Sequence, residues 1–282
     1  MTLLLKSDPA SAPGDYVAPL LKWAGGKRAL LRELLPLIPQ SHRKYFEPFA
    51  GGAALFFALQ PKTAVISDTN ADLVNCYQQV RDEPDRVIGV LRSLRNTEAT
   101  YYRVRSWNPR APIQQAARLI YLVTLSFNGI YRQNLHGDFN VPYGQKKYLD
   151  PADPDRVRTA SRVLQNAEIK ALDFEAAVVT AKRGDIVYLD PPYTVAHGNN
   201  GFIKYNAKIF SWDDQLRLAR VAQTLVQRGC CVIISNAMHQ SILSLYKGFD
   251  RIVVHRKSAI AADSSFRGQV SEYIFYNEGK GL

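Results

Sequence analysis

The stretch DIVYLDPPY, residues 185–193, decides the fold class. Its apolar part, which ends at Leu189, is a short run of the kind found in a strand buried on both faces. Asp190 and two prolines follow at once, and proline lacks the N–H that a strand needs. We therefore predict a buried strand that stops at Asp190 and places this carboxylate at the carboxyl edge of a sheet.

Strands and helices alternate on both sides of this stretch, as is typical of a mostly parallel sheet with helices on both faces. The other predicted strands are a short one ending at Tyr45-Phe46 and residues 63–68, 168–172, 230–235, 250–256 and 269–276. The predicted helices are 30–38, 53–60, 70–82, 173–182, 211–229 and 239–246. The last two strands, separated only by a polar loop, are expected to form an antiparallel hairpin at the sheet edge.

Between the two alternating parts, the pattern changes to short helices over residues 84–95, 98–107 and 112–127. A stretch rich in Gly, Asn and Pro follows, without periodicity, and it mixes aromatic with basic side chains, which suits a nucleic-acid surface. The pattern predicts an α/β domain of residues 18–75 and 166–282, an inserted, mainly helical module of residues 76–165, and a flexible stretch over residues 1–17.

Composition narrows the class of protein further. Hydrophobic residues at 46% and charged residues at 22% are ordinary globular values. The 36 Lys and Arg exceed the 25 Asp and Glu by eleven, a net charge that favours a polyanionic partner such as nucleic acid. Three cysteines and five histidines have no metal-binding spacing, so we expect free thiols and no metal. No apolar run is long enough for a membrane span or a signal peptide, and we expect a cytoplasmic protein.

Two cofactor signals fall at predicted carboxyl ends of strands, where open α/β sheets bind ligands. Phe49 and Gly51 belong to the turn FAGG, residues 49–52, whose glycines allow a ligand to approach the backbone. Asp68 ends the next strand, seventeen residues after Gly51, and an acid at such a place binds ribose hydroxyls in dinucleotide folds. The pair indicates a nucleoside cofactor without fixing which one.

The third signal is the DPPY motif, and we expect catalysis from Asp190, Pro191, Pro192 and Tyr193. The locked prolines leave carbonyl oxygens beside the Asp190 carboxylate, so the corner can accept both hydrogens of an exocyclic amine. Tyr193 offers a flat face for a planar base, and a base can reach this corner only after leaving the duplex. A purely structural turn is the alternative.

Several motifs then occur in one order along the chain: KWAGGK (22–27), FEPFAGG (46–52), SDTNADL (67–73), FNGIYRQN…GDFNVPYG (127–144), DPPY (190–193) and SN (235–236). With these motifs, over about residues 20–278, the chain resembles the Dam family (D12 class) of DNA adenine-N6 methyltransferases. The resemblance implies a Rossmann-like methyltransferase fold, S-adenosylmethionine as methyl donor without a metal, and a target-recognition domain inserted before DPPY. The sequence departs from the family pattern at Ala53, where a glycine is usual, and at Gln145 and Lys146, where an aromatic residue is usual.

The resemblance also assigns roles to individual residues. Trp23 and Lys27 become cofactor contacts, Asp68 takes the cofactor ribose, and Asp190 meets both cofactor and target amine. The residues that fall where the family touches double-stranded DNA are Lys22, Asn128, Ile130, Arg132, Pro142 and Lys146. Arg132 is expected to read guanine in GATC, with a phosphate contact as the alternative. The loop 194–206 is expected either to cover the substrate, with Lys204 on a phosphate, or to be a plain surface loop.

Two alternative functions stay open at this point: an adenine-N6 methyltransferase acting on RNA, and a catalytically silent DNA-binding protein of the same fold. We expect a monomer encoded by a bacterium or a phage, associated with the nucleoid and not with a membrane. A cognate restriction nuclease is the one protein partner considered.

Overall fold

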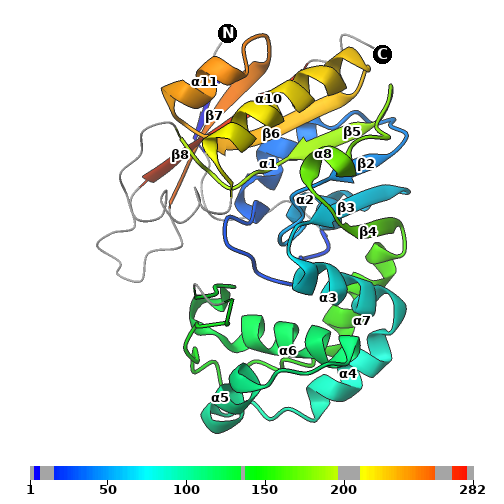
Figure 1. Ribbon diagram of the computed structural model, residues 1–282, viewed down its shortest axis with the longest axis vertical. Coiled ribbons are helices and arrows are strands. Elements are labelled where there is room, and N and C mark those ends of the chain that lie inside the picture. Colours follow the sequence, from blue (N-terminus) through cyan, green and yellow to red (C-terminus); the bar gives the residue numbers. More distant parts are fainter. Residues whose placement is uncertain (1–2, 7–15, 135–136, 196–209, 258–268, 278–282) are drawn as a thin grey trace.

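A computed structural model describes residues 3–6, 16–134, 137–195, 210–257 and 269–277. Within these residues, eight strands form one sheet in the order β1-β7-β8-β6-β5-β2-β3-β4. All neighbours run parallel except β8, which is antiparallel to both β6 and β7. Helices lie on both sides of the sheet (Figure 1), so the predicted Rossmann-like α/β fold is confirmed.

The elements have the following bounds. The strands are β1 (Leu3–Lys6), β2 (Tyr45–Glu47), β3 (Ala64–Asp68), β4 (Ala167–Ala171), β5 (Ile186–Leu189), β6 (Cys231–Ala237), β7 (Asp250–Lys257) and β8 (Gln269–Tyr276). The α-helices are α1 (Leu31–Leu34), α2 (Ala54–Leu59), α3 (Ala71–Asp82), α4 (Pro84–Arg92), α5 (Glu98–Ser106), α6 (Pro112–Leu125), α7 (Pro154–Leu164), α8 (Phe174–Ala177), α10 (Trp212–Gln227) and α11 (Gln240–Leu245). None of these helices is long and apolar enough to cross a bilayer.

The central strands are buried on both faces, and their side chains alternate between two cores. In β5, Tyr188 packs into the core formed with α1, α2 and α3, whereas Leu189 packs into the core formed with α8, α10 and α11. This two-sided burial explains why the strand reads as a continuous apolar run and not as an alternating one. It also leaves only the strand ends free to carry polar site residues.

The helices α4 to α7 lie between β3 and β4 in the sequence and extend away from the sheet (Figure 1). Helix α3 joins the two parts and continues without a break through residues 75 and 76, the predicted boundary. Helix α7 was missed by the sequence analysis. Asp153 caps it by accepting a hydrogen bond from the Arg156 N–H at 3.1 Å, and Pro154 occupies its first turn. These residues read as a turn when only the local sequence is considered, because proline and aspartate favour both turns and helix starts.

Three expectations about the fold need correction. Leu3–Lys6 form β1 and pair with β7, so the prediction of a flexible stretch over residues 1–17 is wrong for these four residues. The last two strands are antiparallel as predicted, but β8 lies inside the sheet, because Ile274 and Phe275 are buried on its opposite faces. The helix predicted over 173–182 ends at Ala177, just before the β-branched residues Val178, Val179 and Thr180.

Candidate active site

The DPPY motif begins where β5 ends, and a buried ion pair ties it to the KWAGGK motif. Lys27 Nζ lies 2.8 Å from Asp190 Oδ1 and donates a hydrogen bond to the Gly25 carbonyl at 2.8 Å. Lys27 is only 4% exposed, so its charge depends on these partners. The fold therefore brings together two residues that the sequence analysis assigned to the same site.

A second carboxylate in this corner was missed by the sequence analysis. Glu272, on β8, is fully buried, and its Oε2 accepts a hydrogen bond from the Tyr193 hydroxyl at 2.6 Å and lies 3.9 Å from Lys27 Nζ. Lys27 Nζ also lies 4.7 Å from the centre of the Tyr193 ring, within cation–π range. Burial, together with the Glu272 charge, raises the pKa of Tyr193 well above its ordinary value, so the phenol stays a donor. The sequence signal that could have identified Glu272 is that it is the single acid in the apolar run VSEYIF, residues 270–275.

Glu47, at the end of β2, is a further buried acid that the sequence analysis missed. Its Oε2 accepts hydrogen bonds from the Tyr45 hydroxyl at 2.8 Å and from the Phe56 N–H at 3.2 Å. Burial raises the pKa of Glu47 to about 8, with the nearby charge of Asp190 as an additional cause. Glu47 is therefore mostly protonated at pH 7.

Asn236 of the SN motif is linked to the DPPY motif by hydrogen bonds through Gln215. Gln215, on α10, donates a hydrogen bond to the Pro192 carbonyl at 3.4 Å and accepts one from the Asn236 side chain at 3.1 Å. Both amide side chains are fully buried. The Pro192 carbonyl is thus held by the protein, and the motif's position is fixed by two neighbouring elements.

The glycine turn and Asp68 meet at the ends of β2 and β3. Gly51 N–H donates to Asp68 Oδ2 at 3.0 Å, and Asn70 N–H donates to Oδ1 at 2.9 Å. Gly51 has a φ of 45°, and a Cβ there would lie 2.9 Å from Trp23 Cδ1, so only glycine fits. Burial raises the pKa of Asp68 despite these bonds. The two predicted cofactor signals therefore form one structural unit with Trp23.

The departure at Ala53 has a visible cost. Ala53 precedes α2 with a φ of 50°, in the left-handed region that glycine adopts without penalty. Gly52 does not replace it, because a Cβ at Gly52 would lie 3.1 Å from the Leu21 carbonyl, so this glycine serves a separate close contact. The chain thus keeps the turn geometry at the expense of some backbone strain.

An aromatic cluster lies beside the glycine turn. The Phe49 ring stacks on Phe174 with a centroid distance of 5.3 Å and meets Phe210 edge-on at 5.6 Å. Phe49 is half-buried, whereas its two partners are almost fully buried. The predicted cofactor contact at Phe49 is therefore the accessible edge of an apolar surface.

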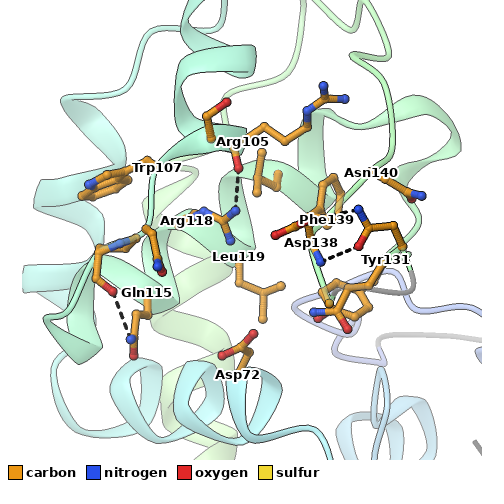
Figure 2. Close-up of a pocket in the computed structure, with 17 residues that line it drawn as sticks. Asp72, Arg105, Trp107, Gln115, Arg118, Leu119, Tyr131, Asp138, Phe139 and Asn140 are labelled. Atoms are coloured by element: carbon orange, nitrogen blue, oxygen red, sulfur yellow. Dashed lines mark hydrogen bonds between the residues drawn. The ribbon is translucent and has the colours of Figure 1, made fainter.

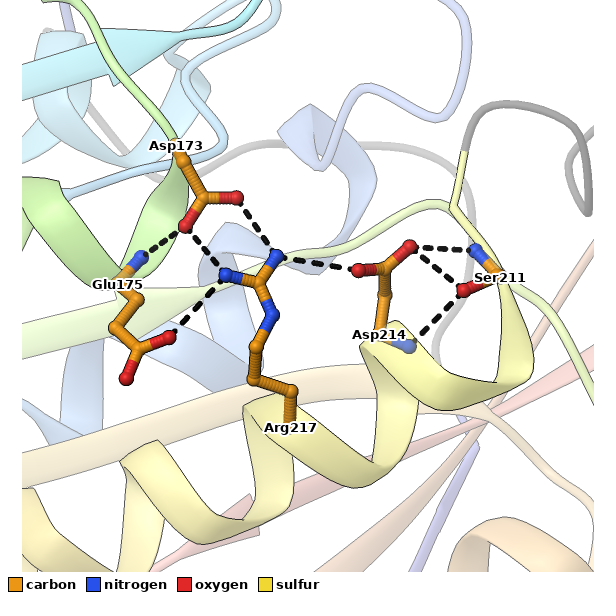
Figure 3. A network of polar contacts seen from close by, with 5 residues as sticks. All are labelled: Asp173, Glu175, Ser211, Asp214 and Arg217. Carbon is orange, nitrogen blue, oxygen red and sulfur yellow. Dashed lines mark hydrogen bonds and ion pairs between the residues drawn. The ribbon is translucent and has the colours of Figure 1, made fainter.

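Next to this cluster, Arg217 on α10 is the centre of a network of ion pairs and hydrogen bonds (Figure 3). Its two terminal nitrogens each donate to one oxygen of Asp173 at 2.8 Å, and they also contact Glu175 at 3.2 Å and Asp214 at 3.1 Å. The guanidinium lies 4.2 Å from the Phe174 ring centre. Hydrogen bonding by Arg217 holds the pKa of Asp173 below its usual value. The bidentate pair orients the ends of α8 and α10 toward each other.

The predicted DNA-contacting residues converge on the turn that follows α6. A Cβ added to Gly129 would lie 3.2 Å from Lys146 Nζ and 3.3 Å from Lys22 Cδ, so both lysines border this turn. Lys146 Nζ also donates to the Thr124 carbonyl at 3.0 Å, and burial, together with the charge of Lys22, lowers its pKa. Asn128 adopts a left-handed conformation with a φ of 56°. The turn thus carries clustered positive charge from two distant parts of the chain.

The helix predicted over 112–127 ends at Leu125, and residues 126–134 and 137–144, most of which lack periodicity in the sequence, pair with themselves as an irregular hairpin; we call this segment the recognition hairpin. Its pairings are Ser126 with Tyr143, Gln133 with Phe139, and Phe127 N–H with the Pro142 carbonyl at 2.9 Å. Arg132 is exposed, and its Nε donates to Asn140 Oδ1 at 2.8 Å. Pro142 is exposed and Ile130 half-buried. A Cβ at Gly144 would lie 2.6 Å from the Ser126 carbonyl, so the glycine of VPYG allows the two hairpin arms to cross closely.

Tyr131 connects the recognition hairpin to the site. Its ring stacks on Trp23 with a centroid distance of 4.5 Å and an angle of 13° between the planes. Trp23 in turn lies against Gly51. A continuous chain of contacts therefore runs from the hairpin to the predicted cofactor turn.

A polar cavity of about 580 Å³ lies between the recognition hairpin and the helices α3, α5 and α6 (Figure 2). Its lining comes from the start of α3, the α5–α6 connection, α6 and the hairpin. Arg118 donates to the carbonyls of Val104 and Arg105 at 3.1 and 2.7 Å and so closes the end of α5. Tyr131 borders this cavity, but Asp68 and Asp190 do not, so it is separate from the catalytic corner.

Comparison with known proteins identifies the family. The family model described as "D12 class N6 adenine-specific DNA methyltransferase" matches residues 23–260. The chain belongs to this family. It is therefore an enzyme, an adenine-specific DNA methyltransferase.

Three relatives of this D12-class methyltransferase align over 89–95% of their own length. The chain is 38% identical over 271 residues to the type II methyltransferase M1.LlaDCHI of Lactococcus lactis subsp. cremoris, covering 93% of this chain and 95% of the relative. It is 36% identical over 258 residues to the type II methyltransferase M.MjaIII of Methanocaldococcus jannaschii, covering 83% and 89%. It is 30% identical over 263 residues to the DNA adenine methylase of Escherichia coli strain K12, covering 90% and 93%.

The residues of this D12-class site fit a cationic nucleoside donor. The carboxylates of Asp68 and Asp190 lie at the ends of β3 and β5, which flank β2 in the sheet, and the half-buried rings of Trp23 and Phe49 lie at the glycine turn that follows β2. Among the described residues, no group of three or more His, Cys, Asp or Glu side chains could hold a metal ion. Most of the predicted loop 194–206, including Lys204, lies outside the described residues.

Proposed function

We propose that the enzyme transfers a methyl group from S-adenosylmethionine to N6 of an adenine that has been flipped out of duplex DNA, within the sequence GATC. The observation that supports this chemistry best is the corner at the end of β5. There Asp190 is oriented by Lys27 at 2.8 Å, and Tyr193 follows immediately. The glycine turn follows β2, which pairs with β5. Asp68 ends β3, which pairs with β2 on its other side, and it accepts a hydrogen bond from the glycine turn.

The cofactor would lie over the glycine turn. When bound, S-adenosylmethionine supplies a sulfonium-activated methyl group. The Asp68 carboxylate is placed to accept hydrogen bonds from ribose hydroxyls, while Gly51 permits close approach of the backbone. The rings of Trp23 and Phe49 offer apolar and cation–π contacts to a nucleoside with positive charge. Lys27 would contribute to the cofactor site indirectly, because its ion pair with Asp190 orients that carboxylate.

At the reacting atom, Asp190 and the Pro191 carbonyl would accept the two hydrogens of the adenine amine. Accepting both hydrogens directs the nitrogen lone pair toward the methyl carbon for in-line displacement. The bond between the methyl carbon and sulfur would break as the bond to N6 forms, the sulfur would keep the electron pair as a neutral thioether, and N6 would lose one proton to solvent by way of Asp190. Alignment of two bound reactants supplies on the order of 7–11 kcal/mol, so no covalent intermediate is needed. The Asp190 carboxylate also stabilises the positive charge that develops on N6. Tyr193 would stack on the flipped base and replace part of the stacking that the base loses on leaving the duplex.

The recognition hairpin would read the sequence. Arg132 is exposed on this hairpin, and a planar guanidinium matches guanine O6 and N7. Lys22 and Lys146 border the same turn, where backbone phosphates would neutralise their charge. The proposed target-recognition module of residues 76–165 carries the hairpin, while residues 18–75 and 166–282 carry the chemistry.

We further propose that the enzyme acts as a monomer in the cytoplasm of a bacterial or phage-infected cell, where duplex DNA is available. The type II methyltransferases among its relatives make a cognate restriction nuclease a partner to test for. Co-expression of the chain with neighbouring genes of its own genome, followed by plasmid survival assays, would reveal such a nuclease.

Transfer of a radiolabelled methyl group to duplex oligonucleotides tests the proposal. Duplexes containing GATC, each single-base variant of GATC, and the corresponding RNA duplex are compared. We expect label on N6 of adenine in GATC alone. Equal label on all variants would reject the sequence assignment, and label on cytosine would reject the proposed chemistry.

A further inference from the structure

We propose that Glu272 is a positioning residue for methyl transfer. Its buried carboxylate fixes the Tyr193 ring and shares the Lys27 ammonium with Asp190. The inference rests on the proposed function of the DPPY corner and adds a residue from the opposite end of the chain to it.

The first observation in favour of this role is that the Glu272 side chain is completely buried. Glu272 lies on β8, opposite Ala237 of β6 and Val254 of β7, and none of its surface is exposed. An ionised carboxylate at such a place is costly unless hydrogen-bond donors and opposite charge compensate it. The donor at 2.6 Å is the Tyr193 hydroxyl, and the cation at 3.9 Å is Lys27. Among the described residues, the compensation thus comes from two residues of the catalytic corner.

The second step is the orientation of Tyr193. A hydroxyl-to-carboxylate hydrogen bond of 2.6 Å is of the short, charge-assisted kind. Because the bond fixes the tip of the ring while the rigid DPPY backbone fixes its base, the plane of the ring is set before any substrate arrives. A preset stacking surface avoids the entropy loss of ordering that side chain during the reaction.

The third step concerns the strength of Asp190 as an acceptor. Lys27 Nζ lies between two carboxylates, 2.8 Å from Asp190 and 3.9 Å from Glu272. The Lys27 ammonium is thus shared between the two carboxylates and does not belong to Asp190 alone. Without Glu272, Lys27 would neutralise Asp190 alone, and the carboxylate would accept the amine hydrogens less strongly. Glu272 therefore acts through Lys27 and Tyr193, without touching the reacting atoms.

The test compares three variants in steady-state methylation of a GATC duplex. Glu272→Gln keeps the shape and removes the charge, and Tyr193→Phe keeps the ring and removes the hydroxyl. Tyr273→Phe, next to Glu272 on the same strand, is the matched control. We expect kcat to fall about 10- to 100-fold in the first two variants, with KM for DNA and for S-adenosylmethionine within about threefold of wild type. The control should keep kcat within about twofold.

A double variant separates positioning from a merely structural role. If Glu272 acts partly through the Tyr193 hydroxyl, Glu272→Gln with Tyr193→Phe should lose less than the product of the two single losses. A product-like loss, or an unchanged kcat in Glu272→Gln, would overturn the inference. If Glu272→Gln does not fold, Tyr193→Phe decides alone: a lowered kcat at unchanged KM supports the inference, and wild-type kcat overturns it.

The same experiment distinguishes failure of this inference from failure of the proposed function. A wild-type enzyme that does not methylate adenine rejects the proposed function. An active wild type whose Asp190→Ala variant is inactive, combined with normal kcat in Glu272→Gln and Tyr193→Phe, rejects only the role of Glu272.

Discussion

The catalytic corner and the recognition hairpin hold their polar residues in different ways. In the corner, Lys27 and Glu272 are buried, and Asp190 is fixed by a 2.8 Å ion pair at the end of a central strand. In the hairpin, Arg132 is exposed and has a single side-chain hydrogen bond, to Asn140. A change in the corner therefore leaves a buried charge without compensation, whereas a change in the hairpin exchanges one solvated contact for another.

The contrast suggests a division of labour between chemistry and target choice. Buried, interlinked groups have one geometry and suit a reaction that is the same for every target. Exposed groups on a paired scaffold can be substituted without unfolding the protein, so they suit contacts that select a target. The following predictions test whether the two regions respond as differently as this view requires.

The largest effect is expected at Asp190. Asp190→Ala removes the acceptor of the amine hydrogens, and we expect the methylation rate to fall roughly 10²- to 10³-fold, the cost of losing one preorganised electrostatic group. Radiolabelled transfer to a GATC duplex measures the rate, and a DNA-binding assay shows that the folded protein still binds. Asp213→Asn, an exposed acid on α10, serves as control. Near-normal turnover in Asp190→Ala would refute the mechanism.

The next largest effect is a dependence of stability on pH, which is expected because Glu47 is buried in the same corner as Lys27 and Glu272. The folded-state pKa of Glu47 is about 8 and lies above its ordinary value of 4.5, so the folded protein keeps a proton that the unfolded chain releases between these values. The free energy of unfolding should therefore decrease as the pH rises from about 4.5 to about 8, by on the order of a few kcal/mol. Glu47→Gln, which resembles the protonated acid, should lose this decrease.

Chemical denaturation at pH 5, 6.5 and 8 measures the difference between wild type and Glu47→Gln, in which the contributions of all other titrating groups cancel. Glu98→Gln, at an exposed position on α5, should behave as wild type. Parallel pH profiles for wild type and Glu47→Gln would show that Glu47 is ionised in the folded state.

A smaller and selective effect is expected in the hairpin. If Arg132 contacts guanine with two hydrogen bonds, Arg132→Ala should lose about 1–3 kcal/mol of discrimination at one base pair, or roughly 5- to 150-fold. Methylation of GATC and of its single-base variants measures this loss in wild type and variant. A uniform loss on all duplexes would instead assign Arg132 to the phosphate backbone.

The smallest effect concerns salt. Binding of duplex DNA should weaken with added salt, with a slope of log K against log salt of about −0.9 for each phosphate contacted. Lys22→Gln, which removes one exposed charge beside Gly129, should make this slope less steep by about one contact and weaken binding to all sequences alike. Filter binding between low and physiological salt provides the slopes. A wild-type slope of zero would mean that the positive surface does not face DNA.

Most of the sheet could be predicted because its strands are continuous apolar runs bounded by Gly, Pro or Asp. The positions of Asp68 and Asp190 followed from the same boundaries, since carboxyl ends of parallel strands meet at one edge. Glu272 could not be placed in the corner, because the position of β8 inside the sheet depends on burial of both its faces and not on its neighbours in sequence. The recognition hairpin was missed for a related reason: its pairing rests on a few backbone bonds around Asn128 and Gly144 and not on a repeating pattern.

Helix α3 has one more consequence. It starts directly after Asp68 and Asn70, at the carboxyl end of β3. It packs against α6 and α7, so we expect it to move as a rigid element together with these helices. Its 12 residues span about 18 Å at 1.5 Å per residue. A tilt of about 5° around one end would displace the other by about 1.5 Å, an amount at which reacting groups lose alignment. If the helical part contacts DNA as proposed, its displacement on an ill-fitting sequence would also move the start of α3, which directly follows Asp68.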